Sequence, residues 1–295
     1  MTGTTASPTF PAPSHAMHSY STPLTSPDLP TTSPHPTDLT ARTPDAVRRR
    51  PSVRAAWYWE NRKAPNRWYW GAVTALCTLA SLSGYLQYRT HQSEFQARGN
   101  TWDIIWPQST LVLSMWLLPL VMSGFAAQIA TGEHQGDNWQ RMRANRLETA
   151  MVAGKLLHCL QVAVVTTAIL ILTTAVTGLA AGFSLLGLTA YFPRFGATVL
   201  GMWGILTFVT WLGTMVRSFA TTMITVTLGA IVGTAMLLTA QPLSVLNPMT
   251  ALIRATASLK PEAMTSPGAA AVDSLINLAW VTVFAISLLQ TVRRR

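Results

Sequence analysis

Residues 131–155 read TGEHQGDNWQRMRANRLETAMVAGK and form the one long charged interruption in the apolar second half of the chain. Uncharged segments long enough to cross a membrane lie on both sides of this stretch. A polar loop between two spans faces water, and an excess of Arg and Lys is typical of the cytoplasmic side. Because Trp139 and Met142 are three residues apart, we expect 136–151 to be mostly helical and amphipathic. An ordinary positive-inside connector is the simpler alternative.

The composition is that of an integral membrane protein. Of the 295 residues, 49% are hydrophobic and 11% are charged, whereas a soluble domain carries about 25% charged residues. The net charge of +10 comes from bases that lie beside apolar segments, which argues against nucleic acid as a partner. Cys77 and Cys159 fall in or beside predicted spans without the spacing of a disulfide framework or a metal site, so we predict neither a metal nor a cofactor.

The chain before the first apolar segment has two parts. Residues 1–46 contain nine Pro, eleven Thr and six Ser, and we predict a disordered cytoplasmic tail because they cannot bury enough apolar surface. Residues 47–67 are basic and aromatic, with Glu60 as the only acid, and around 53–62 we predict a helix in the membrane interface. The candidate anchors to lipid headgroups are Trp57, Trp59, Arg62, Lys63, Arg67 and Trp68.

Residues 68–295 are predicted to form an all-α transmembrane domain with six spans, each near the roughly 20 residues that a helix needs to cross the hydrocarbon. The predicted spans are 68–88, 104–130, 156–181, 195–216, 219–240 and 274–291. Pro119 and Gly124 are the expected kink points of the second span. We expect a short turn over 182–194 and a tight turn at Arg217 and Ser218.

The distribution of bases predicts the orientation. With both termini in the cytoplasm, sixteen Arg and Lys residues lie inside and five outside, in agreement with the positive-inside rule. The segment 241–273 then faces outward, but it is too apolar for a solvated connection and is broken by Pro242 and Pro248. We therefore expect short re-entrant helices there, over about 249–259, protected by the bundle.

The motifs of several enzyme classes are absent from the sequence. It contains no GxSxG, no HExxH and no GxxxxGK phosphate loop, so we expect no catalytic residue and no ATP site. No acid or base lies in the middle of a predicted span. The small-residue pairs Gly178–Gly182 and Gly229–Gly233 permit close helix packing, either within the chain or at a dimer seam.

The arrangement resembles the membrane subunit of an ABC-2 type exporter. That family has six spans, cytoplasmic termini, an interfacial helix before span one, a coupling helix between spans two and three, and re-entrant helices before span six. The residues that carry the resemblance are Glu133, Gly136, Trp139, Arg141, Arg143, Arg146 and Lys155, with Asn247-Pro248 before the last outer helix. Ala144 and Asn145 stand where the family often has a Pro, and Glu148 adds an acid. The small permeases that protect producer cells from lantibiotics belong to this group.

The resemblance implies a division of labour. A separate ATP-binding subunit would bind the segment that contains Glu133, Gly136, Trp139, Arg141, Arg143, Arg146 and Lys155. Two copies of this chain, or this chain with a sister permease, would form the path for an amphipathic substrate. Two alternatives stay open on the sequence: a polytopic anchor or sensor that does not transport, and a secondary carrier. The carrier is disfavoured because the spans lack ionisable residues at their centres and the two halves show no repeat.

Overall fold

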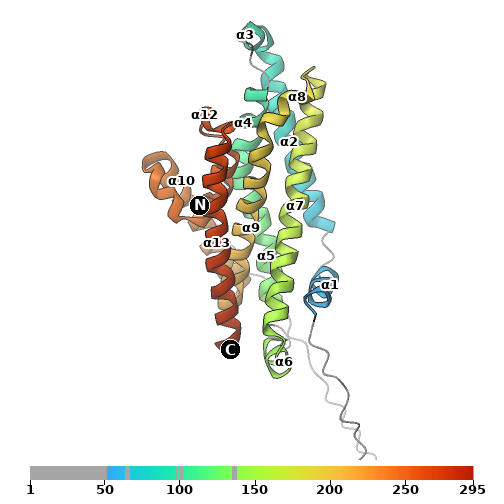
Figure 1. The fold of residues 1–295 in the computed structure, drawn as a ribbon, viewed down its shortest axis with the longest axis vertical. Coiled ribbons are helices and arrows are strands. Elements are labelled where there is room, and N and C mark those ends of the chain that lie inside the picture. Colours follow the sequence, from blue (N-terminus) through green and yellow to red (C-terminus); the bar gives the residue numbers. More distant parts are fainter. Residues whose placement is uncertain (1–51, 64–66, 98, 100–101, 135–137, 295) are drawn as a thin grey trace, which may run out of the picture. The chain divides into compact units, whose positions relative to one another are not determined.

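The computed structural model describes residues 52–63, 67–97, 99, 102–134 and 138–294. These residues belong to the unit Arg49–Arg295 of the chain. Within the described ranges, every regular element is a helix (Figure 1). The predicted tail, 1–46, and residues 64–66 lie outside the described residues.

Long helices run between the two ends of the bundle. They are α2 (Arg67–Thr90), α4 (Trp102–Val112), α5 (Leu118–Gly132), α7 (Glu148–Ala180), α9 (Phe192–Met215), α10 (Phe219–Thr239) and α13 (Pro267–Arg294). The π-helical segment η1 (Leu113–Leu117) joins α4 to α5. Five continuous helical stretches are long and apolar enough to cross a membrane: Trp102–Gly132, Glu148–Ala180, Leu185–Met215, Phe219–Thr239 and Pro267–Arg294. The 24-residue helix α2 is not among these five.

The remaining helices are short. They are α1 (Val53–Lys63), α3 (Gln92–Ala97), α6 (Asn138–Ala144), α8 (Leu185–Leu188), η2 (Thr189–Tyr191), η3 (Gln241–Leu246), η4 (Pro248–Thr250), α11 (Ala251–Thr256) and α12 (Pro261–Met264). Figure 1 shows α8 and α12 at one end and α6, with the C-terminal end of α13, at the other. We call these the α12 end and the α6 end.

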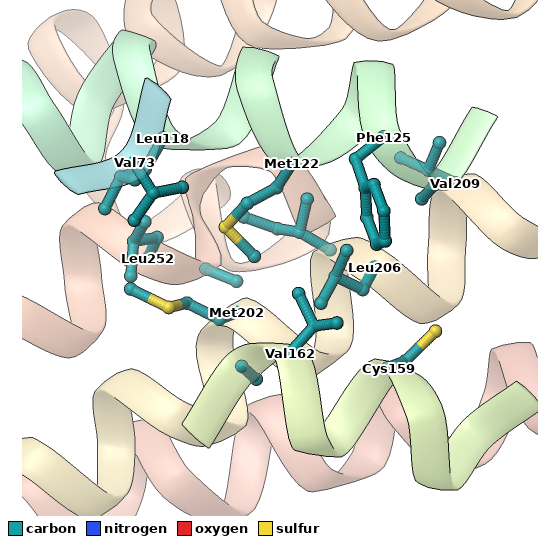
Figure 2. Close-up of a cluster of buried hydrophobic side chains, with 14 of the residues drawn as sticks. Val73, Leu118, Met122, Phe125, Cys159, Val162, Met202, Leu206, Val209 and Leu252 are labelled. Carbon is teal, nitrogen blue, oxygen red and sulfur yellow. The ribbon is translucent and has the colours of Figure 1, made fainter. Parts of the chain in front are cut away.

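The main apolar core lies where α2, α5, α7, α9 and α11 meet. Figure 2 shows Val73, Leu118, Met122, Phe125, Cys159, Val162, Met202, Leu206, Val209 and Leu252 converging there. The ring of Tyr69 stacks on that of Phe125 with centroids 4.5 Å apart, and its hydroxyl forms a 2.9 Å hydrogen bond with Thr166 Oγ1. The aromatic residue at the start of α2 is therefore held by both α5 and α7.

The predicted kink points of the second span differ in outcome. Pro119 is the second residue of α5, two positions after the end of the π-helical segment, and its missing N–H cannot bond to the preceding turn of helix. Gly124 lies within the regular part of α5. The backbone irregularity of this span is therefore located at Leu113–Leu117, beside Pro119 alone.

The predictions for the two segments beside α7 differ in outcome. The stretch 136–151 is mostly helical as expected where it is described, but α6 ends at Ala144 and Arg146 adopts a positive φ of 54° before α7 begins at Glu148. The turn expected over 182–194 is helical from Leu185 onward, since Ser184 caps α8 through a bond from the Leu186 amide. The prediction of a turn over 182–194 was therefore wrong from Leu185 onward.

The segment after α10 folds back against that helix. Asn247 Nδ2 donates to the Gly229 carbonyl over 2.8 Å, and the Asn247 side chain accepts from the Met249 amide. A Cβ at Gly233 would lie 2.7 Å from Thr250 Cγ2, and one at Gly229 would lie 3.2 Å from Met249 Cγ. Both glycines thus face η4 and the turn before it within the same chain. The helix expected over about 249–259 is present as η4 and α11, which end at Thr256.

Candidate functional site

Four charged side chains from three helices meet near the α6 end of the bundle. Lys155 Nζ donates to Glu60 Oε2 over 3.0 Å and to Glu133 Oε1 over 2.8 Å. Lys63 Nζ donates to Glu60 Oε1 over 3.1 Å and to the same Glu133 Oε1 over 2.8 Å. We call Glu60, Lys63, Glu133 and Lys155 the ion cluster. It joins α1, the end of α5 and the second turn of α7.

The ion cluster is neutral and largely shielded from solvent. Glu60, Glu133 and Lys155 are 2%, 4% and 3% exposed, whereas the side chain of Lys63 is 35% exposed. Withdrawing several charges from water is unfavourable unless each one finds an opposite charge at hydrogen-bond distance. Two acids and two bases meet that condition here, so removal of any one member leaves an uncompensated charge.

The pKa of Glu133 records the balance of these forces. Burial alone would raise the pKa of this carboxyl group. The charge of Lys155 and the hydrogen bonds from Lys155 and Lys63 outweigh burial and lower the pKa from 4.5 to about 2. Glu133 is therefore ionised in the folded protein at every physiological pH.

A close helix contact places Glu60 at the cluster. A Cβ at Gly154 would lie 2.7 Å from Ala56 Cβ and 2.9 Å from the Trp57 amide nitrogen, so α1 lies directly against α7 at this position. Trp57 Nε1 also donates to Gln161 Oε1 over 2.9 Å, two turns further along α7. Glu60 is the only buried residue in α1. Because α1 packs this closely against Gly154, the side chain of Glu60 is buried in the bundle.

The helix α6 is attached to the bundle by its apolar side and by its last turn. Met142 packs against the buried cluster of Met151, Val152, Leu288 and Val292 from α7 and α13. The Leu147 amide donates to the Met142 carbonyl over 2.9 Å and closes the turn into α7. A groove of about 270 Å³ separates α6 from α1, and Glu60 and Lys63 form part of its wall.

A second connection joins the segment between α5 and α6 to α9. His134 Nε2 lies 3.0 Å from the Gly213 carbonyl oxygen. A Cβ at Gly213 would lie 2.7 Å from Ala130 Cβ, so α5 and α9 are in close contact at the same level. The segment that follows Gly132 is therefore attached to α9 by His134 and to α1 and α7 by Glu133.

The structure divides the predicted coupling residues into two groups. Glu133 and Lys155 are buried and bond to each other. Arg141 and Arg146 are exposed on and after α6. Gly136 and the side chains of Trp139 and Arg143 lie outside the described residues.

The predicted interfacial anchors also differ from one another. Trp59, Arg62, Arg67 and Trp68 are exposed, and the Arg62 guanidinium lies 5.4 Å from the centre of the Tyr58 ring. Trp57 is exposed but donates to α7, and Lys63 belongs to the ion cluster. Glu60, which sequence reasoning left without a role, is the best buried member of the cluster. Its signal in the sequence is that it is the only acid among the bases of 47–67.

Two basic residues are buried inside helices that are long enough to span. Lys155 lies two turns into α7, and Arg194 lies in the first turn of α9 with none of its surface exposed. Each had been placed just outside a predicted span, because the helices extend further than the uncharged segments. Within the described residues, no group of three or more His, Cys, Asp or Glu side chains has the arrangement of a metal site.

Comparison with known families gives one match. The family model described as ABC-2 family transporter protein matches residues 62–266, which is more than half of the chain. The match runs from the end of α1 to the last residue before α13 and includes Glu133 and Lys155. A search among curated proteins finds no match to the chain.

Proposed function

Because the chain belongs to the ABC-2 transporter family and is a multi-pass membrane protein, we propose that it is the permease subunit of an ATP-driven exporter in the cytoplasmic membrane. Permeases of this family generally work with a separate ATP-binding subunit. The absence of a phosphate-binding loop from the sequence fits that division of labour. The permease itself is then a transport component and not the catalytic subunit.

We propose that α2 is a sixth span. Its 24 residues rise about 36 Å at about 1.5 Å per residue, which exceeds the roughly 30 Å of hydrocarbon. Its buried residues lie three or four positions apart on one face: Tyr69, Val73, Cys77, Ser81, Gly84 and Tyr88. Leu79, Leu82 and Leu86 are exposed on the remainder of the helix, as expected for a surface in contact with lipid. Six spans place both termini on one side, and the charge distribution favours the cytoplasm.

The observation that best supports a coupling role is the ion cluster beneath α6. It links α1, α5 and α7 at one point, while Met142 ties α6 to α7 and α13. A force applied to α6 by an ATP-binding subunit would therefore reach several helices together. In this proposal the residues that contact the ATPase are Gly136, Trp139, Arg141, Arg143 and Arg146. Glu133 and Lys155 hold the surrounding helices.

The substrate class follows from the family and not from a described binding site. We propose an amphipathic substrate, either a peptide antibiotic or a lipid-like molecule, that moves along the interface between two copies of this chain or between it and a sister permease. Lipids would surround the exposed apolar faces and the aromatic side of α1.

The test is co-purification with a separate ATP-binding subunit that is expressed together with this chain. The double variant Trp139→Ala with Arg143→Glu should reach the membrane normally but lose the ATPase, because interface hot spots favour Trp and Arg. The matched control is Arg217→Glu, which reverses an exposed charge in the turn between α9 and α10 at the same end. The control should retain the ATPase.

The alternatives give different results in this experiment. Equal recovery of the ATPase with parent and double variant would reduce the α6 loop to a positive-inside connector. A protein that transports without any ATP-binding partner would be a secondary carrier. A protein that binds the ATPase but neither transports nor stimulates ATP hydrolysis would be an anchor or sensor.

A further inference from the structure

A second charged region lies at the α12 end of the bundle, around a cavity of about 360 Å³. Pockets that bind small ligands usually have volumes of about 300–1,000 Å³. The cavity is enclosed by residues from α10, η3, α11, α12 and α13, with Arg254, Lys260 and Asp273 as its charged members. It lies at the α12 end of the bundle, whereas the ion cluster lies near the α6 end (Figure 1).

The guanidinium group of Arg254 has no partner within the described residues. Its Nε, Nη1 and Nη2 atoms are all buried, and none of them forms a hydrogen bond there. The residue as a whole is half-buried, so the shielding is concentrated on the charged group. Arginine stays protonated in proteins, and a buried charge without a partner is unfavourable. Burial lowers the pKa of Arg254, while the charge of Asp273 opposes this shift.

The one acid of the cavity is already bound to another base. Arg194 Nη1 donates to Asp273 Oδ2 over 2.7 Å, and Arg194 Nη2 donates to the Ala263 carbonyl over 2.6 Å. Arg194 is fully buried, and the side chain of Asp273 is 19% exposed. Asp273 is thereby neutralised, and Arg254 and Lys260 give the cavity a net positive charge.

The rest of the cavity is mostly apolar. Leu237, Val245, Ile253, Leu259, Val272 and Ile276 contribute to its walls. Leu259 and Val272 are also exposed, so the apolar wall continues to the surface of the bundle. A site with a shielded cation and an apolar wall matches a molecule that has an anionic group and a hydrocarbon part.

We propose that this cavity binds an anionic amphiphile, with a phosphate or carboxylate on Arg254 and an apolar chain against Leu259, Val272 and Ile276. The planar guanidinium presents its donors in a fork that fits two oxygens of such a group. Lys260, which is exposed at the same cavity, adds a second positive charge. The ligand would supply the counter-charge that the described chain does not provide.

The same chemistry has two possible sources, a membrane phospholipid and an anionic molecule that the protein exports. The site does not depend on the proposed transport function, because it is defined only by the cavity and its charged residues. Binding and ATPase coupling can therefore be tested separately on the same purified full-length chain.

The first arm uses dodecyl phosphate as the probe, added to the full chain in nanodiscs of zwitterionic phosphatidylcholine. We expect saturable binding, weakened about tenfold or more by Arg254→Gln, because charge-assisted hydrogen bonds are lost. Arg89→Gln is the matched control, since Arg89 is exposed beside Tyr85 on α2 and outside the cavity. Inorganic phosphate should bind much more weakly than dodecyl phosphate.

A second variant tests the cavity without changing its charge. Ala269→Phe would place an aromatic ring in the cavity and should also weaken the binding of dodecyl phosphate. The melting temperature of the variant tests whether it is folded. Equal binding by the parent, Arg254→Gln and Ala269→Phe would overturn the proposal. So would binding of dodecyltrimethylammonium, which has the same chain and the opposite charge, as tightly as dodecyl phosphate.

The second arm identifies the source of the ligand. Nanodiscs that also contain phosphatidylglycerol are studied by native mass spectrometry of the released protein. Phosphatidylglycerol retained by the parent and by Arg89→Gln, but lost from Arg254→Gln, would assign the site to a membrane lipid. Retention equal in all three proteins, together with Arg254-dependent binding of dodecyl phosphate, would assign it to a soluble or exported amphiphile.

Discussion

The two charged regions of this protein differ in how their buried charges are paired. In the ion cluster, Lys155 meets two acids within 3.0 Å, and the four members sum to zero charge. In the cavity at the α12 end, Asp273 meets Arg194 at 2.7 Å, and the guanidinium of Arg254 has no hydrogen-bond partner within the described residues. The charges of the ion cluster sum to zero, whereas Arg254 and Lys260 leave the cavity with a net positive charge.

This difference distinguishes a structural contact between helices from a ligand-binding site. A buried cluster whose charges are all paired resists separation of its helices, because moving any member exposes unpaired charge in a region of low dielectric. A buried cation without a partner lowers stability until a ligand arrives, and such strain is typical of functional sites. We therefore expect removal of a paired charge to lower the free energy of unfolding, and removal of the Arg254 charge to raise it.

The largest effect is expected for Lys155→Met. This substitution leaves Glu60 and Glu133, both nearly fully buried, with only the half-exposed Lys63 between them. Breaking a buried pair by removing one partner typically lowers the free energy of unfolding by about 3–5 kcal/mol. Chemical unfolding in detergent, followed by circular dichroism, measures the loss.

A compensated variant serves as the control for that loss. Glu60→Gln and Glu133→Gln together with Lys155→Met remove all three buried charges, so most of the stability should return. If the triple variant is as unstable as the single one, packing and not charge pairing explains the effect, and the comparison of the two regions fails.

A second prediction compares two arginines that lie at the same cavity. Arg194→Met should lower the free energy of unfolding by about 3 kcal/mol, because it leaves Asp273 unpaired beside the bundle. Arg254→Met should raise it by about 1 kcal/mol in the absence of ligand, because a buried charge without a partner is removed. Melting temperatures in lipid-free detergent test the signs. Two losses of equal size would mean that Arg254 is satisfied in the free protein.

The five helical stretches that are long and apolar enough to cross a membrane were predictable, because they depend on local composition. The predicted span 219–240 agrees with α10 to within one residue, since an unbroken apolar run follows Ser218 and its side chain caps the helix by accepting from the Thr221 amide. The turn at Arg217 and Ser218 was correct for the same reason. The lengths of α7 and α9 were underestimated, because the uncharged segments begin only after Lys155 and Arg194, whereas the helices begin before these residues.

The ion cluster was not predictable in the same way. Glu60 and Lys155 are 95 positions apart in the chain, and no periodicity connects them. Their meeting depends on the close contact of α1 with Gly154, which a single sequence does not reveal. Among the described residues Arg254 has no hydrogen-bond partner, and this too was not predictable, because Asp273 is bound by a third residue, Arg194.

The helix contact that closes the ion cluster gives a third prediction. Gly154→Ala would place a Cβ 2.7 Å from Ala56 Cβ and 2.9 Å from backbone atoms of α1, so α1 must move away and draw Glu60 from Lys155. Overpacking of this kind lowers the free energy of unfolding by about 2 kcal/mol. The control is Gly71→Ala in α2, where a Cβ would meet nothing within 4 Å. That substitution should leave stability unchanged or raise it, since Ala is the better helix former.

The smallest expected effect is on the pH dependence of the ion cluster. The pKa of Glu133 falls from 4.5 to about 2 on folding, so its contribution to stability is complete above about pH 4.5 and is lost as the pH falls toward about 2. By about pH 4 the loss is only about 1 kcal/mol. Other carboxyl groups titrate in the same window, so the quantity to measure is the difference in free energy of unfolding between the parent and Glu133→Gln. This difference should shrink from pH 6 to pH 4, because only the parent binds an extra proton on unfolding. A difference that stays constant over that range would show that Glu133 is not held ionised by Lys155 and Lys63, and the ion cluster would then lack the charge balance that distinguishes it from the cavity.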